Sequence, residues 1–392
     1  MKSTGLNPFA FTVRLAYMTL VTPRSLPPIL WGAPGSAKTS VVGQMAASLG
    51  MPMETIIASV CDPTDFGGYP IPDGETLKRL PMQWASNLLR KGKGIAFIDE
   101  ISTCPPATQA ALLRCVLDGA VGDLQLPRYG DAEDDSGVRW MAAANPPEQA
   151  AGGHELTDPL QNRFVHIEWP SPDAAAWCEY MLTGNGILGG LPPFDREAWN
   201  KSWGRSKALV TSFIRARPTL LTENPDKIRG RFPMAFATPR SWDCAARLLA
   251  TTIAFDESEA VFPLFKACVG EPAAQEFTTW LRTADLPDPE SLLKNADLWT
   301  PDPKRPDLTF AVLTSVAACA TEARPTAEEY GRRWVAAWSV LAKAMAQGKD
   351  IVVVAAKMLA SKRPIGKNGL LKPEVQKVAM SLLGVIDAAN AR

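Results

Sequence analysis

The chain of 392 residues carries 41 Lys and Arg against 41 Asp and Glu, so its formal net charge at pH 7 is zero. Proteins that bind nucleic acid or an anionic membrane often carry an overall positive charge, and this chain does not. Such a partner could bind here only through a local basic patch. With 46% hydrophobic and 21% charged residues, the composition is that of a soluble globular protein, and the length is enough for two or three domains.

The cysteines and the apolar segments argue against a secreted or membrane protein. Seven cysteines are scattered singly, and with only two histidines they predict neither a disulfide framework nor a zinc site. We expect buried thiols in a reducing cytoplasm. Residues 9–21 are apolar but contain Arg14 and lack a cleavage site, so we expect a helix beside the first strand rather than a signal peptide. The uncharged run 308–321 is too short to cross a bilayer.

Residues 28–50 predict a strand, a glycine-containing loop and a helix, in that order. The apolar run 28–31 suits a buried strand, and residues 40–49 have a helical composition that ends at Gly50. The loop between them, GAPGSAKTS, nearly matches the phosphate-binding pattern G-x-x-x-x-G-K-[ST], but Ala37 stands where the second glycine is expected. An ordinary turn that ends in Lys-Thr is the alternative.

The chemistry of a bound triphosphate explains why these residue types point to a nucleotide. Backbone N–H groups, a positive charge and a magnesium ion are needed. Gly32 and Gly35 allow positive φ angles, Lys38 would reach the β- and γ-phosphates, and the Thr39 hydroxyl would bind magnesium. With one carboxylate further along the chain, the predicted nucleotide-binding residues are Gly32, Ala33, Pro34, Gly35, Ser36, Ala37, Lys38, Thr39, Ser40 and Asp99.

The carboxylates of the site are expected in GIAFIDEIS, residues 94–102. Residues 95–98 predict a buried strand that ends in Asp99 and Glu100, and the carboxyl edge of a parallel sheet is where ligands bind. We expect Asp99 to join Thr39 around magnesium and Glu100 to orient and polarise the attacking water. Two solvated acids in a surface turn are the alternative.

Two further polar residues are candidates for catalysis. Asn145 follows the predicted strand 140–144, where its amide can bind the γ-phosphate and the attacking water, although a simple Asn-Pro turn is the alternative. Arg163 precedes the strand-like segment 164–168 and can stabilise charge on a transferring phosphoryl group, unless it is a surface arginine anchored by Asp158.

Arg240 is a third candidate, at the start of a predicted helix. Thr238 is expected to cap this helix and Pro239 to open it. A cation in the first turn opposes the helix dipole, which indicates that Arg240 has an anionic partner. A phosphate or a nearby acid such as Asp243 would satisfy it.

Taken in order, these elements resemble the AAA+ ATPases, and within them the MoxR and dynein-related branch. GAPGSAKT is similar to that branch's Walker A loop, in which alanine before the lysine is familiar, and FIDE is similar to Walker B. AAANPPEQ resembles the sensor 1 segment, LQNRF the arginine-finger segment and ATPRSW the start of the sensor 2 helix. The resemblance implies these roles for Asn145, Arg163 and Arg240, and it departs from the family in the long acidic stretch 128–138.

The resemblance implies an α/β fold, a P-loop NTPase core of three layers with a parallel sheet, followed by an α-helical lid and a further helical module. We expect the core at residues 1–172, the lid at 173–260 and the C-terminal module, of unknown role, at 261–392. Residues 53–60 predict the second strand. The Gly- and Pro-rich stretch 62–81, between that strand and the following helix, corresponds to the family's helix-2 insert, which faces the central channel or a partner. A plain surface loop is the alternative.

The family further implies that the chain hydrolyses ATP with Mg²⁺ in a homo-oligomeric ring, usually of six subunits, in which Arg163 acts on the neighbouring subunit. MoxR relatives act as protein remodellers or chaperones, often with a partner that bears a von Willebrand factor A domain. A nucleic-acid motor is one alternative, which the neutral charge disfavours. An ATP-gated assembly scaffold is another, which the complete catalytic set disfavours.

Overall fold

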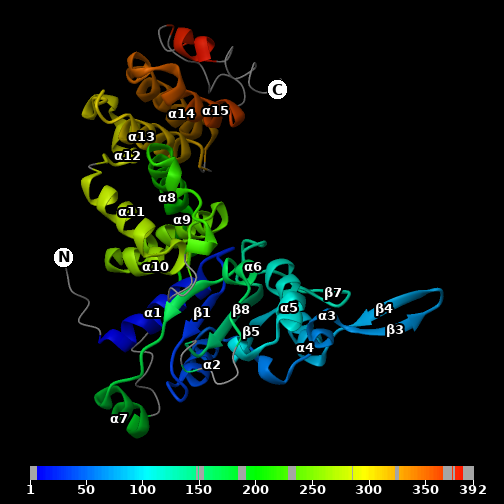
Figure 1. The fold of residues 1–392 in the computed structure, drawn as a ribbon. Coiled ribbons are helices and arrows are strands. Elements are labelled where there is room, and N and C mark those ends of the chain that lie inside the picture. The colour runs from blue at the N-terminus through cyan, green and yellow to red at the C-terminus, as the bar shows by residue number, and fades with distance from the viewer. Residues whose placement is uncertain are drawn as a thin grey trace. The chain divides into compact units, whose positions relative to one another are not determined.

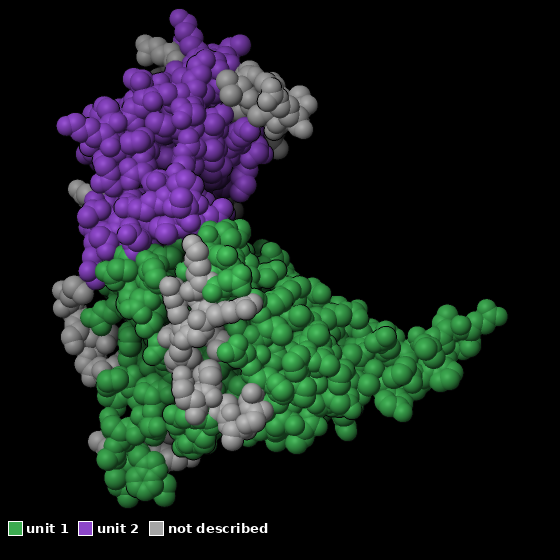
Figure 2. Space-filling model, in the orientation of Figure 1, with its two compact units in different colours: residues 1–194, 222–275 green, residues 195–221, 276–392 purple. Residues whose placement is uncertain are grey.

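The structure is a computed structural model that describes residues 7–146, 149, 154–183, 191–227, 235–284, 286–322, 326–364, 373 and 376–382. The chain forms two compact units, coloured separately in Figure 2. Unit 1 comprises residues 1–194 and 222–275, and unit 2 comprises residues 195–221 and 276–392. The division into core, lid and C-terminal module remains a prediction; part of the expected lid segment, 195–221, belongs to unit 2.

Unit 1 is built around a five-stranded parallel sheet, as predicted. The strand order is β2 (Met53–Ile57), β5 (Lys93–Asp99), β8 (Gly137–Ala144), β1 (Pro28–Trp31) and β9 (Val165–Glu168). The three central strands are buried almost throughout, because both faces of the sheet are covered and continuous apolar runs are stable there.

Helices flank the sheet (Figure 1). The helices with residues in unit 1 are α1 (Pro8–Val21), α2 (Lys38–Ser48), α3 (Pro63–Gly67), α4 (Gln83–Lys91), α5 (Pro106–Asp118), α6 (Asp158–Gln161), α7 (Ala174–Thr183), α9 (Pro239–Ala254), α10 (Val261–Val269) and the start of α11 (Glu271–Thr283). The apolar segment 9–21 does form a helix beside the first strand, since α1 packs against β1 and β9.

The Gly- and Pro-rich insert is an ordered hairpin. After α3, strands β3 (Tyr69–Asp73) and β4 (Thr76–Leu80) pair antiparallel and extend away from the sheet (Figure 1). A second, short hairpin of β6 (Ala120–Val121) and β7 (Leu124–Gln125) holds its base. There the Arg79 N–H donates to Asp123 Oδ2 at 2.7 Å, and the Asp123 N–H donates to Arg79 O at 3.1 Å.

Unit 2 is helical in the part that the structure describes. Its helices are α8 (Arg196–Ala216), the rest of α11, α12 (Pro289–Lys294), α13 (Pro306–Ala320), α14 (Ala327–Lys343) and α15 (Lys349–Ser361). Trp334 and Trp338 of α14 lie in its apolar core, with ring centroids 5.8 Å apart. None of the helices in the described residues is both long and apolar enough to span a bilayer.

Candidate nucleotide-binding site

The carboxyl ends of three neighbouring strands bring the predicted phosphate-site residues together. β1 leads into the loop 32–37, β5 ends at Asp99, and Asn145 follows β8, and these strands are adjacent in the order β5-β8-β1. The Gly32 N–H still donates to Ala144 O at 3.1 Å, so the loop begins where the sheet ladder ends. This is the edge at which open parallel sheets bind ligands.

Two residues of the loop have left-handed backbone conformations, Gly35 with φ 74° and Ala37 with φ 64°. Glycine adopts this conformation freely, whereas for alanine it costs about 1–2 kcal/mol. Ala37 therefore provides the turn that a glycine would provide, at a cost in stability. Gly32 is needed for a different reason, because a Cβ there would lie 2.7 Å from the carbonyl oxygen of Trp169.

Trp169, the residue after β9, braces this loop and was missed by the sequence analysis. Its indole Nε1 donates to Ser36 O at 3.0 Å, and its main-chain N–H donates to Trp31 O at 2.6 Å. Phe9 of α1 packs edge-on against it with ring centroids 5.4 Å apart. The sequence gives one indication of this role, which is that a tryptophan directly follows β9, the strand beside the one that leads into the loop.

Lys38 is buried among acceptors. Its Nζ donates to Gly32 O at 2.6 Å, to Ala33 O at 3.0 Å and to Asn145 Oδ1 at 3.3 Å. Burial lowers the pKa of Lys38, and the nearby Asp99 charge opposes this effect. The ammonium is thus held on the loop, in contact with the predicted sensor amide.

Thr39 and Asp99 meet in the geometry expected of a shared metal site. Thr39 Oγ1 donates to Asp99 Oδ2 at 2.7 Å. A hydroxyl and a carboxylate are the hard oxygen ligands that Mg²⁺ prefers, and Mg²⁺ completes its shell with water and phosphate oxygens. The described residues contain no group of three or more His, Cys, Asp or Glu that could hold a metal ion without a nucleotide.

The carboxylate of Glu100 accepts a hydrogen bond from Ser59, a residue that was expected to lie in a strand. Glu100 has φ 56°, and Ser59 Oγ donates to Glu100 Oε2 at 2.6 Å. Ser59 lies just past β2 in a 3₁₀ turn of residues 58–60, because the pairing of β2 with β5 stops at Ile57 and Asp99. The expectation of strand over residues 58–60 was therefore wrong.

Arg163 and Arg240 lie close to each other. Thr238 Oγ1, at the cap of α9, donates to Asn162 Oδ1 at 2.8 Å, so the first turn of α9 rests on the residue before Arg163. Burial lowers the pKa of Arg163, and the positive charge of Arg240 lowers it further, against the opposing charge of Asp118. Two adjacent cations of this kind favour the binding of an anion.

Asp158 and Asp243 were the alternative partners of Arg163 and Arg240. Neither of these ion pairs forms within the described residues. Arg163 donates to the main-chain oxygen of Pro159 rather than to Asp158. Asp243 pairs with Arg247 at 2.8 Å, one turn further along α9, rather than with Arg240.

A buried histidine supports the segment that carries Arg163. Trp31 Nε1 donates to His166 Nδ1 at 3.0 Å, so the ring proton is on Nε2, which donates to Gln161 O at 2.9 Å. Burial lowers the pKa of His166 to about 4, which keeps the ring neutral near pH 7. The histidine links the strand below the loop to the turn before Arg163.

A cavity of about 310 Å³ lies beside β9, between α1 and α10. Phe11, Leu15 and Phe262 contribute apolar walls, and at the rim Lys266 pairs with Glu168 at 3.0 Å. Glu168 directly precedes Trp169, the residue that braces the phosphate loop. The volume lies at the lower end of small-molecule sites, about 300–1,000 Å³, and sequence analysis gave no indication of this cavity.

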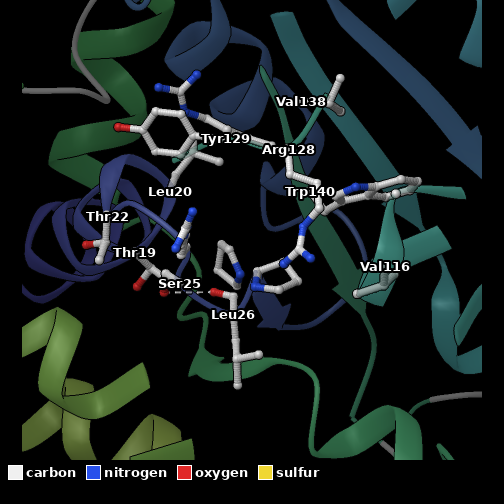
Figure 3. Close-up of a pocket in the computed structure, with 15 residues that line it drawn as sticks. Thr19, Leu20, Thr22, Ser25, Leu26, Val116, Arg128, Tyr129, Val138 and Trp140 are labelled. Carbon is white, nitrogen blue, oxygen red and sulfur yellow. Dashed lines mark hydrogen bonds between the residues drawn. The ribbon is translucent and has the colours of Figure 1, made fainter. Parts of the chain in front are cut away.

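A smaller pocket of about 60 Å³ lies at the opposite, amino end of β1 and β8 (Figure 3). Its arginines are engaged by the acidic stretch 128–138: the Arg139 guanidinium lies 3.4 Å from the centroid of the Tyr129 ring, and Arg24 pairs with Asp131 at 3.1 Å. These contacts hold the acidic stretch against the sheet, at the end opposite to the carboxyl edge where ligands bind.

Comparison with protein families agrees with this geometry. Residues 27–164 match the model of the AAA domain of the dynein-related subfamily. The matched segment includes the loop, the carboxylates, Asn145 and Arg163, but it does not distinguish the MoxR branch. No curated protein matches the chain. Residues 27–164 are thus similar in sequence to an AAA domain, and the match covers about a third of the chain.

Proposed function

We propose that the chain hydrolyses ATP at the carboxyl edge of the sheet. The contact that carries this proposal is the one between Thr39 Oγ1 and Asp99 Oδ2, at 2.7 Å, because it joins the phosphate loop to the acidic strand where a metal is needed. Lys38 would exchange its carbonyl acceptors for the β- and γ-phosphates. Mg²⁺, when bound, supplies charge neutralisation on the phosphates.

Glu100 orients and polarises the attacking water in this proposal. Its carboxylate accepts a hydrogen bond from Ser59 Oγ at 2.6 Å, and this hydroxyl competes with the attacking water for the same carboxylate. Asn145, which touches Lys38, is well situated to bind the γ-phosphate once the lysine turns toward the nucleotide.

We assign the nucleotide base to the cavity beside β9. The triphosphate lies on the loop that Trp169 braces, and the cavity begins at the preceding residue, Glu168. Substituting Phe262 by Asp in the cavity wall should weaken ATP binding with little effect on binding of inorganic tripolyphosphate. Equal weakening of both ligands, measured by calorimetry, would contradict this assignment.

Arg163 and Arg240 act together in the proposed mechanism. Their proximity, with Thr238 bound to Asn162, makes them one cationic group that attracts an anion, although Asp118 offsets part of the charge of Arg163. We propose that this anion is the γ-phosphate of a neighbouring subunit, so that hydrolysis requires a homo-oligomeric ring, with six subunits as the expected number.

The β3–β4 hairpin favours a protein client over a nucleic acid. Tyr69, Leu77 and Leu80 on it are 62%, 70% and 42% exposed. Apolar side chains presented on a hairpin can grip polypeptide, whereas binding of a nucleic-acid strand needs a basic groove with stacking aromatics. We therefore propose a protein remodeller of the MoxR type, whose partner could bear a von Willebrand factor A domain.

A trap experiment tests this function. Glu100→Gln with ATP should hold the client, and Lys38→Ala should not, in nuclease-treated lysate. A protein retained only by Glu100→Gln supports remodelling. Protection of nucleic acid without a protein client would support the motor alternative, and an assembly that forms with ATP without turnover by the wild-type chain would support the scaffold.

A further inference from the structure

Two buried cysteines of unit 1 face each other across neighbouring helices. Cys244 on α9 and Cys268 on α10 have their sulfur atoms 3.7 Å apart, and each side chain is only 2% exposed. A disulfide needs the two sulfur atoms at about 2.05 Å, so they must approach each other from 3.7 Å for the bond to form. The expected buried thiols thus include one pair in contact.

The surroundings make Cys244 the more reactive partner. Burial alone raises the pKa of the Cys244 thiol, but its hydrogen bonds with Cys268, with Ser25 Oγ at 3.4 Å and with the Leu26 main chain outweigh burial and lower the pKa. Cys268 donates to Cys244, and burial together with this bond raises its pKa. A low-pKa thiol beside a protonated one is the arrangement of an attacking and a resolving cysteine.

The other cysteines lack this arrangement. Burial raises the pKa of Cys61 and Cys104 to about 11, and that of Cys115 and Cys319 to about 12. The expectation of buried thiols holds for four cysteines, whereas Cys178 is exposed and Cys61 and Cys319 are only partly buried.

We propose that Cys244 and Cys268 form a reversible disulfide when the protein meets a peroxide. The Cys244 thiolate attacks one peroxide oxygen, the O–O bond breaks, and the leaving oxygen takes a proton to become water. The Cys268 sulfur then attacks the resulting sulfenic acid, the S–S bond forms, and a second water leaves with the remaining proton. Two thiols are oxidised by two electrons, and hydrogen peroxide is reduced to two waters.

The bond would join the two parts of unit 1 on which the proposed mechanism depends. Cys244 lies one turn after Arg240 on α9, and Cys268 directly follows Ala267, which lines the cavity beside β9. The disulfide would therefore fix the arginine helix to the cavity wall. The effect of this disulfide on ATP turnover rests on the proposed function, whereas the formation of the disulfide does not.

Peptide mapping tests the chemistry without any ATPase assay. The native protein is treated with graded hydrogen peroxide, its free thiols are alkylated, and the digest is analysed by mass spectrometry. We expect a cross-linked peptide of Cys244 and Cys268 that lacks two hydrogen atoms and disappears with dithiothreitol. If these two thiols stay reduced, or go separately to sulfinic acids, at doses that oxidise Cys178, the proposal is wrong.

Thermal unfolding and turnover provide the second readout. Oxidised wild type should unfold about 5 °C or more above the reduced protein and hydrolyse ATP about threefold more slowly, both reversed by dithiothreitol. Cys268→Ser should abolish both responses, and Cys115→Ser, which removes another buried thiol, should keep them. A mapped disulfide without the change in turnover would keep the modification and refute its link to Arg240.

Discussion

Lys38 and Arg163 are both cations whose pKa is lowered by burial, but their neighbours differ in kind. Lys38 lies among carbonyl and amide oxygens with Asp99 nearby, so its charge is offset within the chain. Arg163 lies beside Arg240, whose charge repels it. We therefore propose that the phosphate loop is complete within one chain, whereas the arginine pair takes an anion from a neighbouring subunit.

The largest effect should come from breaking the arginine pair. Arg163→Ala should slow ATP turnover by about a thousandfold, because an arginine finger stabilises charge in the transition state, with ATP affinity nearly unchanged. Steady-state hydrolysis and calorimetry measure the two quantities. Arg247→Ala is the matched control, since that arginine pairs with Asp243 on the same helix.

Mixing subunits tests whether the pair acts on a neighbour. Lys38→Ala subunits keep their arginines and Arg163→Ala subunits keep their phosphate loop. Mixed in equal amounts they should recover part of the wild-type turnover. Activity no greater than the sum of the separate variants would contradict action between subunits.

Within the complete site, Glu100→Gln should lower turnover by about a hundredfold or more, because general-base assistance is lost, and should still bind ATP. Glu133→Gln, an exposed acid at the opposite edge of the sheet, is the control and should match wild type. Turnover of Glu100→Gln near the wild-type rate would remove Glu100 from the mechanism.

Lys38→Ala should abolish the stabilisation of the protein by ATP. At a ligand concentration 100 times Kd, binding stabilises a wild-type fold by about 2.7 kcal/mol, which a thermal melt with Mg-ATP detects as a rise of a few degrees in Tm. Lys91→Ala, an exposed lysine of α4, should retain this rise. A Lys38→Ala protein that ATP stabilises as strongly as wild type would show that the loop does not hold the phosphates.

Ser59→Ala should raise basal turnover by about two- to fivefold, because Glu100 loses a charge-assisted hydrogen bond that competes with the attacking water. Initial rates at saturating ATP measure the change. Thr103→Ala, which removes a hydroxyl bonded only to the main chain of Glu100, is the matched control. A fall in turnover for Ser59→Ala would mean that Ser59 positions Glu100 for catalysis instead.

A last prediction concerns stability in acid rather than turnover, and it rests on His166. Its pKa is about 4 in the fold against the ordinary 6.5, so between these values the unfolded chain binds a proton that the folded chain does not. Stability therefore falls as the pH drops from 6.5 to 4, by about 3 kcal/mol from this group. His166→Gln should be less stable than wild type at pH 7, with the gap narrowing toward pH 4 in urea titrations. If the difference in the free energy of unfolding between the two proteins does not change with pH, His166 does not titrate in this way.

Much of the candidate nucleotide site could be predicted because its parts are local. The apolar run before Gly32 suits a buried strand, and the order of strand, loop and helix follows from the glycines, this short run and a helical composition. Asp99 and Asn145 were found in the same way, since the carboxyl ends of parallel strands share one edge.

Other contacts could not be predicted, because they join residues far apart in the sequence. Ser59 was hidden inside an expected strand, and nothing near it in the chain reveals that it faces Glu100. The indole of Trp169 and the cavity beside β9 depend on how α1 and α10 pack on the edge strand. Pattern reasoning had no means of measuring that packing.

The residues of the phosphate loop and its carboxylates can therefore be read along the chain, because backbone preferences and strand ends place them with little help from the rest of the fold. The pairing of Arg163 with Arg240, and of Cys244 with Cys268, arises only when α9 settles against α6 and α10. Such pairings depend on helix packing, and the sequence pattern of each helix specifies which face is buried but not which residue it will meet.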